Sequence, residues 1–109
     1  MVSINRTADR SWRSDGRPGV QFAVLRLHGA EGATLISRFQ SGIAGGQHTH
    51  PAGEELLVLE GECEVNGVRL CAGDYLYTPP GERHELVALT DTTVFVHLPK
   101  LPTYDDVAR

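Results

Sequence analysis

The sequence predicts a single all-β domain, and three observations support this fold class. Short segments rich in β-branched and aromatic residues recur along the 109-residue chain. Turn-forming residues separate them, since the chain contains 12 glycines and 6 prolines. No segment combines the length and the period of an amphipathic helix. Many short strands joined by Gly/Pro turns are typical of a β-sandwich or a barrel.

The predicted strands follow a polar N-terminal stretch. Residues 1–19 end in Gly16-Arg17-Pro18-Gly19, so we interpret them as an N-terminal arm and residues 20–109 as the single barrel domain. Trp12 is the large apolar group of this arm, and we expect it to pin the arm to the barrel or to a partner subunit. The predicted strands are Val20–His28, Ala33–Gln40, Glu54–Glu60, Glu62–Val65, Val68–Cys71, Tyr75–Thr78, Glu85–Leu89 and Thr93–Leu98.

The two cysteines lie in a predicted hairpin around Asn66-Gly67, a strong signal for a two-residue turn. In that register Cys63 faces Leu70, while Cys71 faces Glu62. The two thiols then point to opposite faces of the ribbon and cannot form a disulfide without disrupting it. We therefore expect two reduced packing residues, as in a cytosolic protein.

The segment Leu56-Leu57-Val58-Leu59 is apolar on both faces. One face must line the barrel, and the other needs a cover, because a strand with one solvated face would alternate. A second sheet, the N-terminal arm or another subunit could supply that cover. A homodimer is our hypothesis.

Three histidines and a glutamate lie in two frames punctuated by glycine and proline. The first frame runs from Gly42 through His48, His50 and Glu54 to Gly61, and the second runs from Gly73 through Pro79-Pro80-Gly81 to His84. His48 and His50 project together, because residues two apart on a strand share a face. Glu54 faces the same side as both histidines, provided that the turn between them does not shift the alternation of side chains. Glu55 would point the other way, so we choose Glu54 as the carboxylate and expect Glu55 to face solvent or an interface.

These two frames resemble the two motifs of the cupin superfamily (RmlC-like proteins), and the stretch His48–Gly61 looks most like the ChrR-type branch. The resemblance implies a double-stranded β-helix, that is, a jelly-roll barrel. It also implies a metal site built from His48, His50, Glu54 and His84. The chain departs from the second motif at Ala88, where Asn is frequent, but the ligand set does not depend on this position.

The implied cofactor is one divalent transition metal ion, and Fe, Zn, Ni and Mn all suit this ligand set. Four protein ligands on an octahedral ion leave two adjacent positions open, whereas zinc with the same ligands can form a closed tetrahedral site. The first arrangement favours catalysis, and the second favours a structural or sensing role.

The resemblance supports more than one function, because the ChrR-type branch includes the metal-binding domain of an anti-sigma factor and small stand-alone dioxygenases. The leading hypothesis is a metal-dependent enzyme on a small molecule, an Fe(II) dioxygenase for a diketone or a phenolic ketone. The alternatives are a non-catalytic metal- or ligand-sensing cupin and a metal-assisted isomerase or cyclase. No catalytic residue beyond the ligands is assigned.

Five further polar residues are candidates for a cavity wall or for the surface. His97, Tyr75 and Tyr77 lie on predicted strands and line the cavity only if they face inward. Arg38 would attract an anionic substrate if it faced inward, but we expect it on the surface. His28 precedes Gly29 at a strand end and is also expected on the surface.

Bulk properties exclude two kinds of partner. The net charge is −4 and there is no basic run, so nucleic acid is not an expected partner. The arginines of the arm are interrupted by aspartates and are interpreted as a solvated arm; they are Arg6, Arg10, Arg13 and Arg17. No apolar run approaches the roughly 18 residues of a membrane span, and the N-terminus has no hydrophobic signal core. We expect a cytoplasmic protein without a membrane partner.

Overall fold

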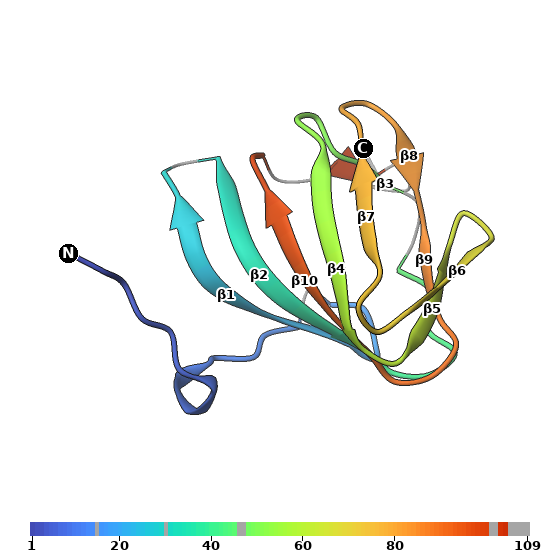
Figure 1. The fold of residues 1–109 in the computed structure, drawn as a ribbon, viewed down its shortest axis with the longest axis horizontal. Coiled ribbons are helices and arrows are strands. Elements are labelled where there is room, and N and C mark those ends of the chain that lie inside the picture. The colour runs from blue at the N-terminus through green and yellow to red at the C-terminus, as the bar shows by residue number, and fades with distance from the viewer. Residues whose placement is uncertain (15, 30, 46–47, 101–102, 105–109) are drawn as a thin grey trace.

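A five-stranded antiparallel sheet forms one wall of the barrel, with strand order β1-β2-β10-β4-β7 (Figure 1). The computed structural model describes residues 1–14, 16–29, 31–45, 48–100 and 103–104. The strands of this large sheet are β1 (Val20–His28), β2 (Gly32–Phe39), β10 (Thr92–Leu98), β4 (Glu54–Glu60) and β7 (Tyr75–Thr78).

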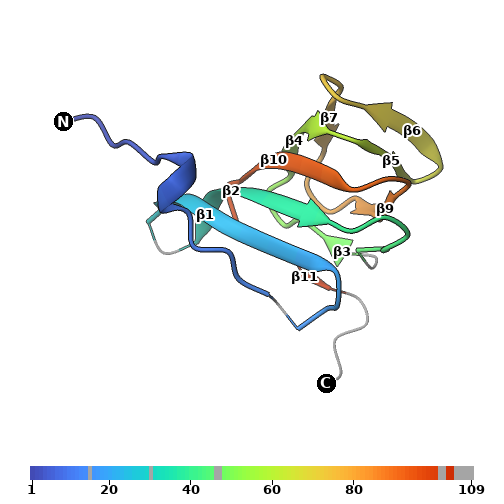
Figure 2. The same ribbon diagram turned by 90° about the horizontal axis from the view of Figure 1, so that it is seen from below.

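Two three-stranded antiparallel sheets form the opposite wall, as Figure 2 shows from below. The first has the order β11-β3-β8 and the second has the order β6-β5-β9. Their strands are β11 (Thr103–Tyr104), β3 (His48–Thr49), β8 (Arg83–His84), β6 (Val68–Cys71), β5 (Glu62–Val65) and β9 (Leu86–Ala88). The chain thus folds as the all-β double-stranded β-helix that its two sequence frames predict.

The eight predicted strands match observed strands to within one residue at each end, and the predicted strand Glu85–Leu89 corresponds to β9 (Leu86–Ala88). The two-residue strands β3, β8 and β11 were not predicted. Strands this short carry no alternating pattern, so only their pairing partners reveal them.

The hairpin of β5 and β6 has the predicted register, with Cys63 opposite Leu70 and Glu62 opposite Cys71. Asn66 and Gly67 have φ values of 50° and 82°, as a type I′ turn requires. Cys63 is buried and Cys71 is exposed, and both thiols are free. The prediction of two unpaired cysteines is confirmed, but only Cys63 is a packing residue, because Cys71 lies on the exposed face of the hairpin.

The barrel interior is built by strand alternation. On β10, Val94, Val96 and Leu98 are buried, while Phe95 and His97 between them are half-buried. β4 contributes Leu56 and Val58 to the same core. On its other face Leu57 is half-buried and Leu59 is 41% exposed.

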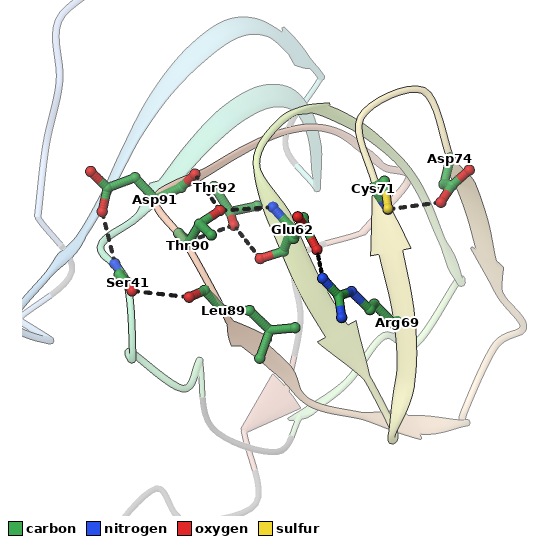
Figure 3. A network of polar contacts seen from close by, with 9 residues as sticks. All are labelled: Ser41, Glu62, Arg69, Cys71, Asp74, Leu89, Thr90, Asp91 and Thr92. Carbon is green, nitrogen blue, oxygen red and sulfur yellow. Dashed lines mark hydrogen bonds and ion pairs between the residues drawn. The ribbon is translucent and has the colours of Figure 1, made fainter.

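A polar network joins the turns around Ser41 and Asp91 to β5 (Figure 3). The Ser41 N–H donates to Asp91 Oδ1 (2.9 Å), and the Ser41 hydroxyl donates to the Leu89 carbonyl (3.0 Å). The Thr92 hydroxyl donates to the Glu62 carbonyl (3.0 Å). These contacts tie the start of the first glycine and histidine frame to the turn that precedes β10.

The N-terminal segment lies against the edge of β1. Arg13 exchanges two backbone hydrogen bonds with Phe22, of 2.8 and 2.9 Å. Trp12 stacks against Arg38 of β2, whose guanidinium carbon lies 3.5 Å from the ring centroid. The tryptophan therefore pins this segment to the barrel, as expected. The division into an arm of residues 1–19 and a barrel of residues 20–109 stays a prediction. Nowhere in the described ranges does a helix have the length and apolar character needed to cross a membrane.

Candidate metal centre

The candidate ligands are brought together by strand pairing. His50 directly follows β3, Glu54 begins β4 and His84 ends β8. β3 pairs with β8 so that the backbone of His48 lies opposite that of His84. β4 pairs with β7 so that Glu54 lies opposite Thr78. Residues 34 positions apart in sequence, such as His50 and His84, thereby become neighbours.

A tight turn connects His50 to Glu54. The carbonyl oxygen of His50 accepts hydrogen bonds from the N–H groups of Gly53 (3.2 Å) and Gly81 (3.0 Å). Gly53 has a φ of 82°, and a Cβ at this position would lie 2.9 Å from the Thr78 carbonyl oxygen. Glycine is therefore required here both for the backbone conformation and for the close approach of β7.

Three ligand-type side chains converge at one point. His50 Nε2 lies 2.8 Å from His84 Nε2. Glu54 Oε2 lies 3.3 Å from His50 Nε2, and Glu54 Oε1 lies 3.3 Å from His84 Nε2. All three residues are buried, with exposed fractions of 1% for His50, 6% for Glu54 and 5% for His84. This cluster could hold a metal ion.

The cluster fits a divalent cation in spacing and in chemistry. Two ligand atoms about 2.1 Å from one ion, at right or tetrahedral angles, lie about 3.0–3.4 Å from each other. The observed separations of 2.8–3.3 Å are close to this range. Glu54 Oε1 is buried and accepts no hydrogen bond from the described residues. A buried oxygen that accepts no hydrogen bond lowers the stability of the folded protein, and a bound cation would offset this loss.

Burial also changes the protonation of the carboxylate. Loss of solvent raises the pKa of Glu54 from 4.5 to about 8. A carboxyl group in this environment is therefore neutral at pH 7 unless a positive charge stabilises its ionised form. A divalent ion would supply that charge.

The structure describes only the backbone of His48, the fourth predicted ligand. The backbone of His48 lies in β3. Its side chain lies outside the described part of the chain, so its role as a ligand stays a prediction.

The three ligand-type side chains border a cavity of about 250 Å³ inside the barrel. Apolar side chains from β1, β2, β4 and β10 make most of its wall, including Val20, Phe22, Leu35, Phe39, Leu56 and Val96. Among the described residues, the other polar side chains on the wall are Ser37 and Arg17. The site is thus polar at the ligand cluster and apolar over most of its surroundings.

His97, Tyr75 and Tyr77 do not line this cavity. His97 alternates with the buried residues of β10 and faces the outer side of the large sheet. Tyr75 is 57% exposed and donates its hydroxyl to Glu55 at 2.9 Å, while Tyr77 is 54% exposed. Glu55 is exposed and faces away from the cluster, as its parity predicts.

His28 is half-buried, so its predicted surface position is only partly correct. Its Nε2 lies 2.6 Å from the Thr34 hydroxyl, which lies 3.3 Å from His97 Nδ1. The two imidazole rings are 4.7 Å apart. Cross-strand pairing of β1, β2 and β10 creates this cluster on the outer face.

One arginine lies where the sequence predicts, and another does not. Arg38 is exposed and donates to Gln21 Oε1 at 2.9 Å, which agrees with its predicted surface position. Arg17 was interpreted as part of a solvated arm, but it is half-buried and borders the cavity. Its Nη1 donates to the Gly45 carbonyl. Arg17 precedes β1, so no alternating strand pattern predicts which way its side chain points. The adjoining Pro18-Gly19 was the only local signal in the sequence, and it predicts a turn.

Comparisons with known proteins agree with this fold and site. A family model described as the ChrR cupin-like domain matches residues 2–102. The DNA damage-repair/toleration protein DRT102 of Arabidopsis thaliana is 31% identical over 88 residues, which cover 75% of this chain and 27% of that protein. The chain thus spans about a quarter of the length of that curated relative.

Two solved structures illustrate the range of similar proteins. A chain in the structure of Rhodobacter sphaeroides SigE in complex with the anti-sigma ChrR matches with a TM-score of 0.74 and 29% identity. That match covers 85% of this chain and 51% of the other. An acetylacetone dioxygenase from Acinetobacter johnsonii matches with a TM-score of 0.80 and 17% identity, over 97% of this chain and 78% of the other. At that identity the second match shows a common fold alone.

Proposed function

Because the chain belongs to the ChrR cupin-like domain family, we propose that it is a mononuclear metal-dependent enzyme acting on a small molecule. The proposed ligands are His48, His50, Glu54 and His84. The most specific form of the proposal is an Fe(II)-dependent dioxygenase for a diketone or a phenolic ketone.

One observation carries this proposal: a buried cluster of two imidazole nitrogens and a carboxylate opens onto an apolar cavity of about 250 Å³. A purely structural ion needs no adjoining space, whereas a catalytic ion needs room for substrate. The fold shared with an acetylacetone dioxygenase is consistent with this chemistry but does not establish it.

The residues of this chain would bind the substrate, orient it and exclude water from the metal ligands. A bound divalent iron would supply Lewis-acid polarisation of a substrate oxygen and redox chemistry toward dioxygen. Phe22, Phe39 and Val96 would hold the apolar body of the substrate and keep bulk water from the ligands. Thr78 lies 3.0 Å from His84 Nδ1 and would orient that imidazole.

The first test is metal identification by plasma mass spectrometry, on protein purified without an affinity tag or a chelator. We expect near-stoichiometric iron that is lost in His50→Ala and retained in Glu55→Gln. Glu55 is the matched control, because it is the adjacent carboxylate and faces away from the cluster. Protein without any metal would refute the proposal, and stoichiometric zinc would refute its iron-dependent form.

The second test is oxygen consumption by protein loaded with iron under anaerobic conditions. A panel of diketones and phenolic ketones provides the substrates. Turnover of one of them supports the dioxygenase form, and loss of turnover in His50→Ala links it to the cluster. Absence of turnover across the panel would contradict this form.

A non-catalytic metal-sensing cupin is the second candidate. The family match and the 29% identity to a chain of the SigE–ChrR complex support it. A sensor would change its stability or its binding to a partner on metal loading without consuming oxygen. Stoichiometric zinc combined with no turnover would favour this candidate.

A further inference from the structure

The turn between β5 and β6 contacts the segment that carries the candidate ligand His84. The side chain of Asn66 donates from Nδ2 to the Arg83 carbonyl at 3.1 Å. Its Oδ1 accepts from the Glu85 N–H, also at 3.1 Å. The Asn66 N–H donates to the Glu85 carbonyl at 3.3 Å. One residue of the turn therefore binds the backbone on both sides of His84.

These contacts continue a strand ladder beyond the point where it ends. The pairing of β5 with β9 ends at Val65 and Leu86. The next pair along the ladder would be Asn66 and Glu85, but Asn66 already belongs to the turn and has a φ of 50°. Its side-chain amide supplies the donor and the acceptor that a continuing strand would offer, because a carboxamide carries the same polar groups as a peptide bond.

The two side-chain hydrogen bonds restrict the direction of the His84 side chain. The Arg83 carbonyl belongs to the peptide group before the His84 Cα, and the Glu85 N–H belongs to the peptide group after it. One planar carboxamide bonded to both groups restricts the φ and ψ of His84, which set the direction of its Cα–Cβ bond. His84 Nε2 lies 2.8 Å from His50 Nε2 and 3.3 Å from Glu54 Oε1. A rotation of the backbone here would separate these atoms.

The contact to the backbone is distinct from the contact to the imidazole ring. Thr78 Oγ1 lies 3.0 Å from His84 Nδ1 and restricts rotation of the ring. Asn66 is exposed and is not part of the described wall of the cavity, so it acts on the ligand only through the chain that carries it. β8 and β3 pair over two residues each, and this short ladder leaves much of the restraint on His84 to contacts of this kind.

We infer that Asn66 is a positioning residue for the metal ligand His84, and this inference rests on the proposed metal-dependent function. Its side chain holds residues 83–85 in the conformation in which the imidazole meets His50 and Glu54. Without this side chain the backbone N–H of Asn66 still binds Glu85, so the hairpin stays in place while His84 becomes less restricted. We expect metal affinity to fall by about 3- to 10-fold, less than for a residue that bonds to a ligand ring.

Three variants separate this role from that of an ordinary turn residue. Asn66→Gly removes the side chain and introduces a residue that adopts a positive φ without strain. Asn66→Ala removes the side chain and strains the turn. Gly67→Ala strains the same turn, because Gly67 has a φ of 82° with no atom within 4 Å of an added Cβ, and it keeps the Asn66 side chain.

Positioning predicts that Asn66→Gly and Asn66→Ala behave alike and that Gly67→Ala behaves like the unmodified protein. A role in the turn alone predicts that the two alanine variants behave alike. Cobalt(II) is the probe, because its visible absorption depends on the geometry of its ligands. Competition with a chelator measures its affinity.

We expect both Asn66 variants to bind cobalt about 3- to 10-fold more weakly and with a changed absorption spectrum. Gly67→Ala should show neither change. Unchanged affinity and spectrum in Asn66→Gly would overturn the inference. Losses in Gly67→Ala equal to those in Asn66→Ala would also overturn it, because they would assign the effect to the turn.

A second readout uses metal-free protein, in which NMR measures the ¹⁵N resonances of the imidazole rings. Those of His84 should shift in both Asn66 variants, because the ring moves relative to Thr78. Those of His28 and His97, on the outer face of the large sheet, should not change. Unchanged His84 resonances would overturn the inference. A protein that binds no cobalt would refute the proposed metal site, whereas the His84 resonances still decide whether Asn66 positions this ring.

Discussion

Thr78 Oγ1 lies 3.0 Å from Nδ1 of His84, and both side chains are buried. The opposite ring nitrogen, Nε2, points to His50 and Glu54. If Nε2 binds a metal, Nδ1 carries the hydrogen and donates it to the threonine hydroxyl. The last residue of β7 thus helps to orient a candidate ligand on β8.

Replacing this hydroxyl should weaken metal binding. We expect Thr78→Val to lower metal affinity by about 10- to 100-fold, because partners of this kind orient ligands and raise their basicity. Competition with a chromophoric chelator measures the change. Thr34→Val is a suitable control, since Thr34 also contacts imidazoles, but on the outer face of the sheet. Equal metal affinity in Thr78→Val and in the unmodified protein would show that this contact does not strengthen metal binding.

The stability of the metal-free protein should decrease as pH rises. The pKa of Glu54 is raised from 4.5 to about 8, so between these values the folded state binds more protons than the unfolded state. The contribution to stability is complete below pH 4.5 and is lost as pH approaches 8. We expect this contribution to be on the order of a few kcal/mol.

Urea unfolding at pH 5 and pH 8 in the presence of a chelator measures this dependence. Glu54→Gln removes the ionisable group, so the difference between this variant and the unmodified protein isolates its contribution. Identical pH dependence in both proteins would contradict the raised pKa. Glu55→Gln, which changes an exposed carboxylate, should behave like the unmodified protein.

Gly61, the last residue of the first frame, should not tolerate a side chain. Its φ is 85°, and a Cβ would overlap the carbonyl oxygen of Asp91. Gly67 has a similar φ of 82° with no atom within 4 Å of that Cβ, so it is the matched control. We expect Gly61→Ala to lower the free energy of unfolding by about 1–3 kcal/mol more than Gly67→Ala. Thermal denaturation of both variants tests this, and similar losses would show that the contact with Asp91 is readily relieved.

The outer face of the large sheet should support the predicted homodimer. Cross-strand pairing places Leu57 beside both Phe95 and Tyr75 on this face, and the tyrosine is 57% exposed. Light scattering should give the mass of a dimer, and Leu57→Lys should give that of a monomer. Val68→Lys, at an apolar residue of β6 that is 62% exposed, is the control and should leave the mass unchanged. A monomeric mass for the unmodified protein would remove the hypothesis.

Local chemistry alone determined several parts of this protein. The Asn66-Gly67 turn predicts the register that separates Cys63 from Cys71, because a two-residue turn permits few strand alignments. The period of two residues predicts that Glu54 turns inward and Glu55 outward. The spacing of the two frames predicts the ligand-type residues, including His50 and His84.

Tertiary structure decided which of these residues meet. His50 and His84 become neighbours through the pairing of β3 with β8, and neither two-residue strand has a recognisable pattern of its own. The position of Arg17 depends on where the segment before β1 passes the barrel, which no periodicity encodes. Strand alternation and turns act within a few residues, whereas closure of a barrel depends on long-range register. The sequence therefore predicted the ligand-type residues of the site, and only the folded barrel determined the walls that surround them.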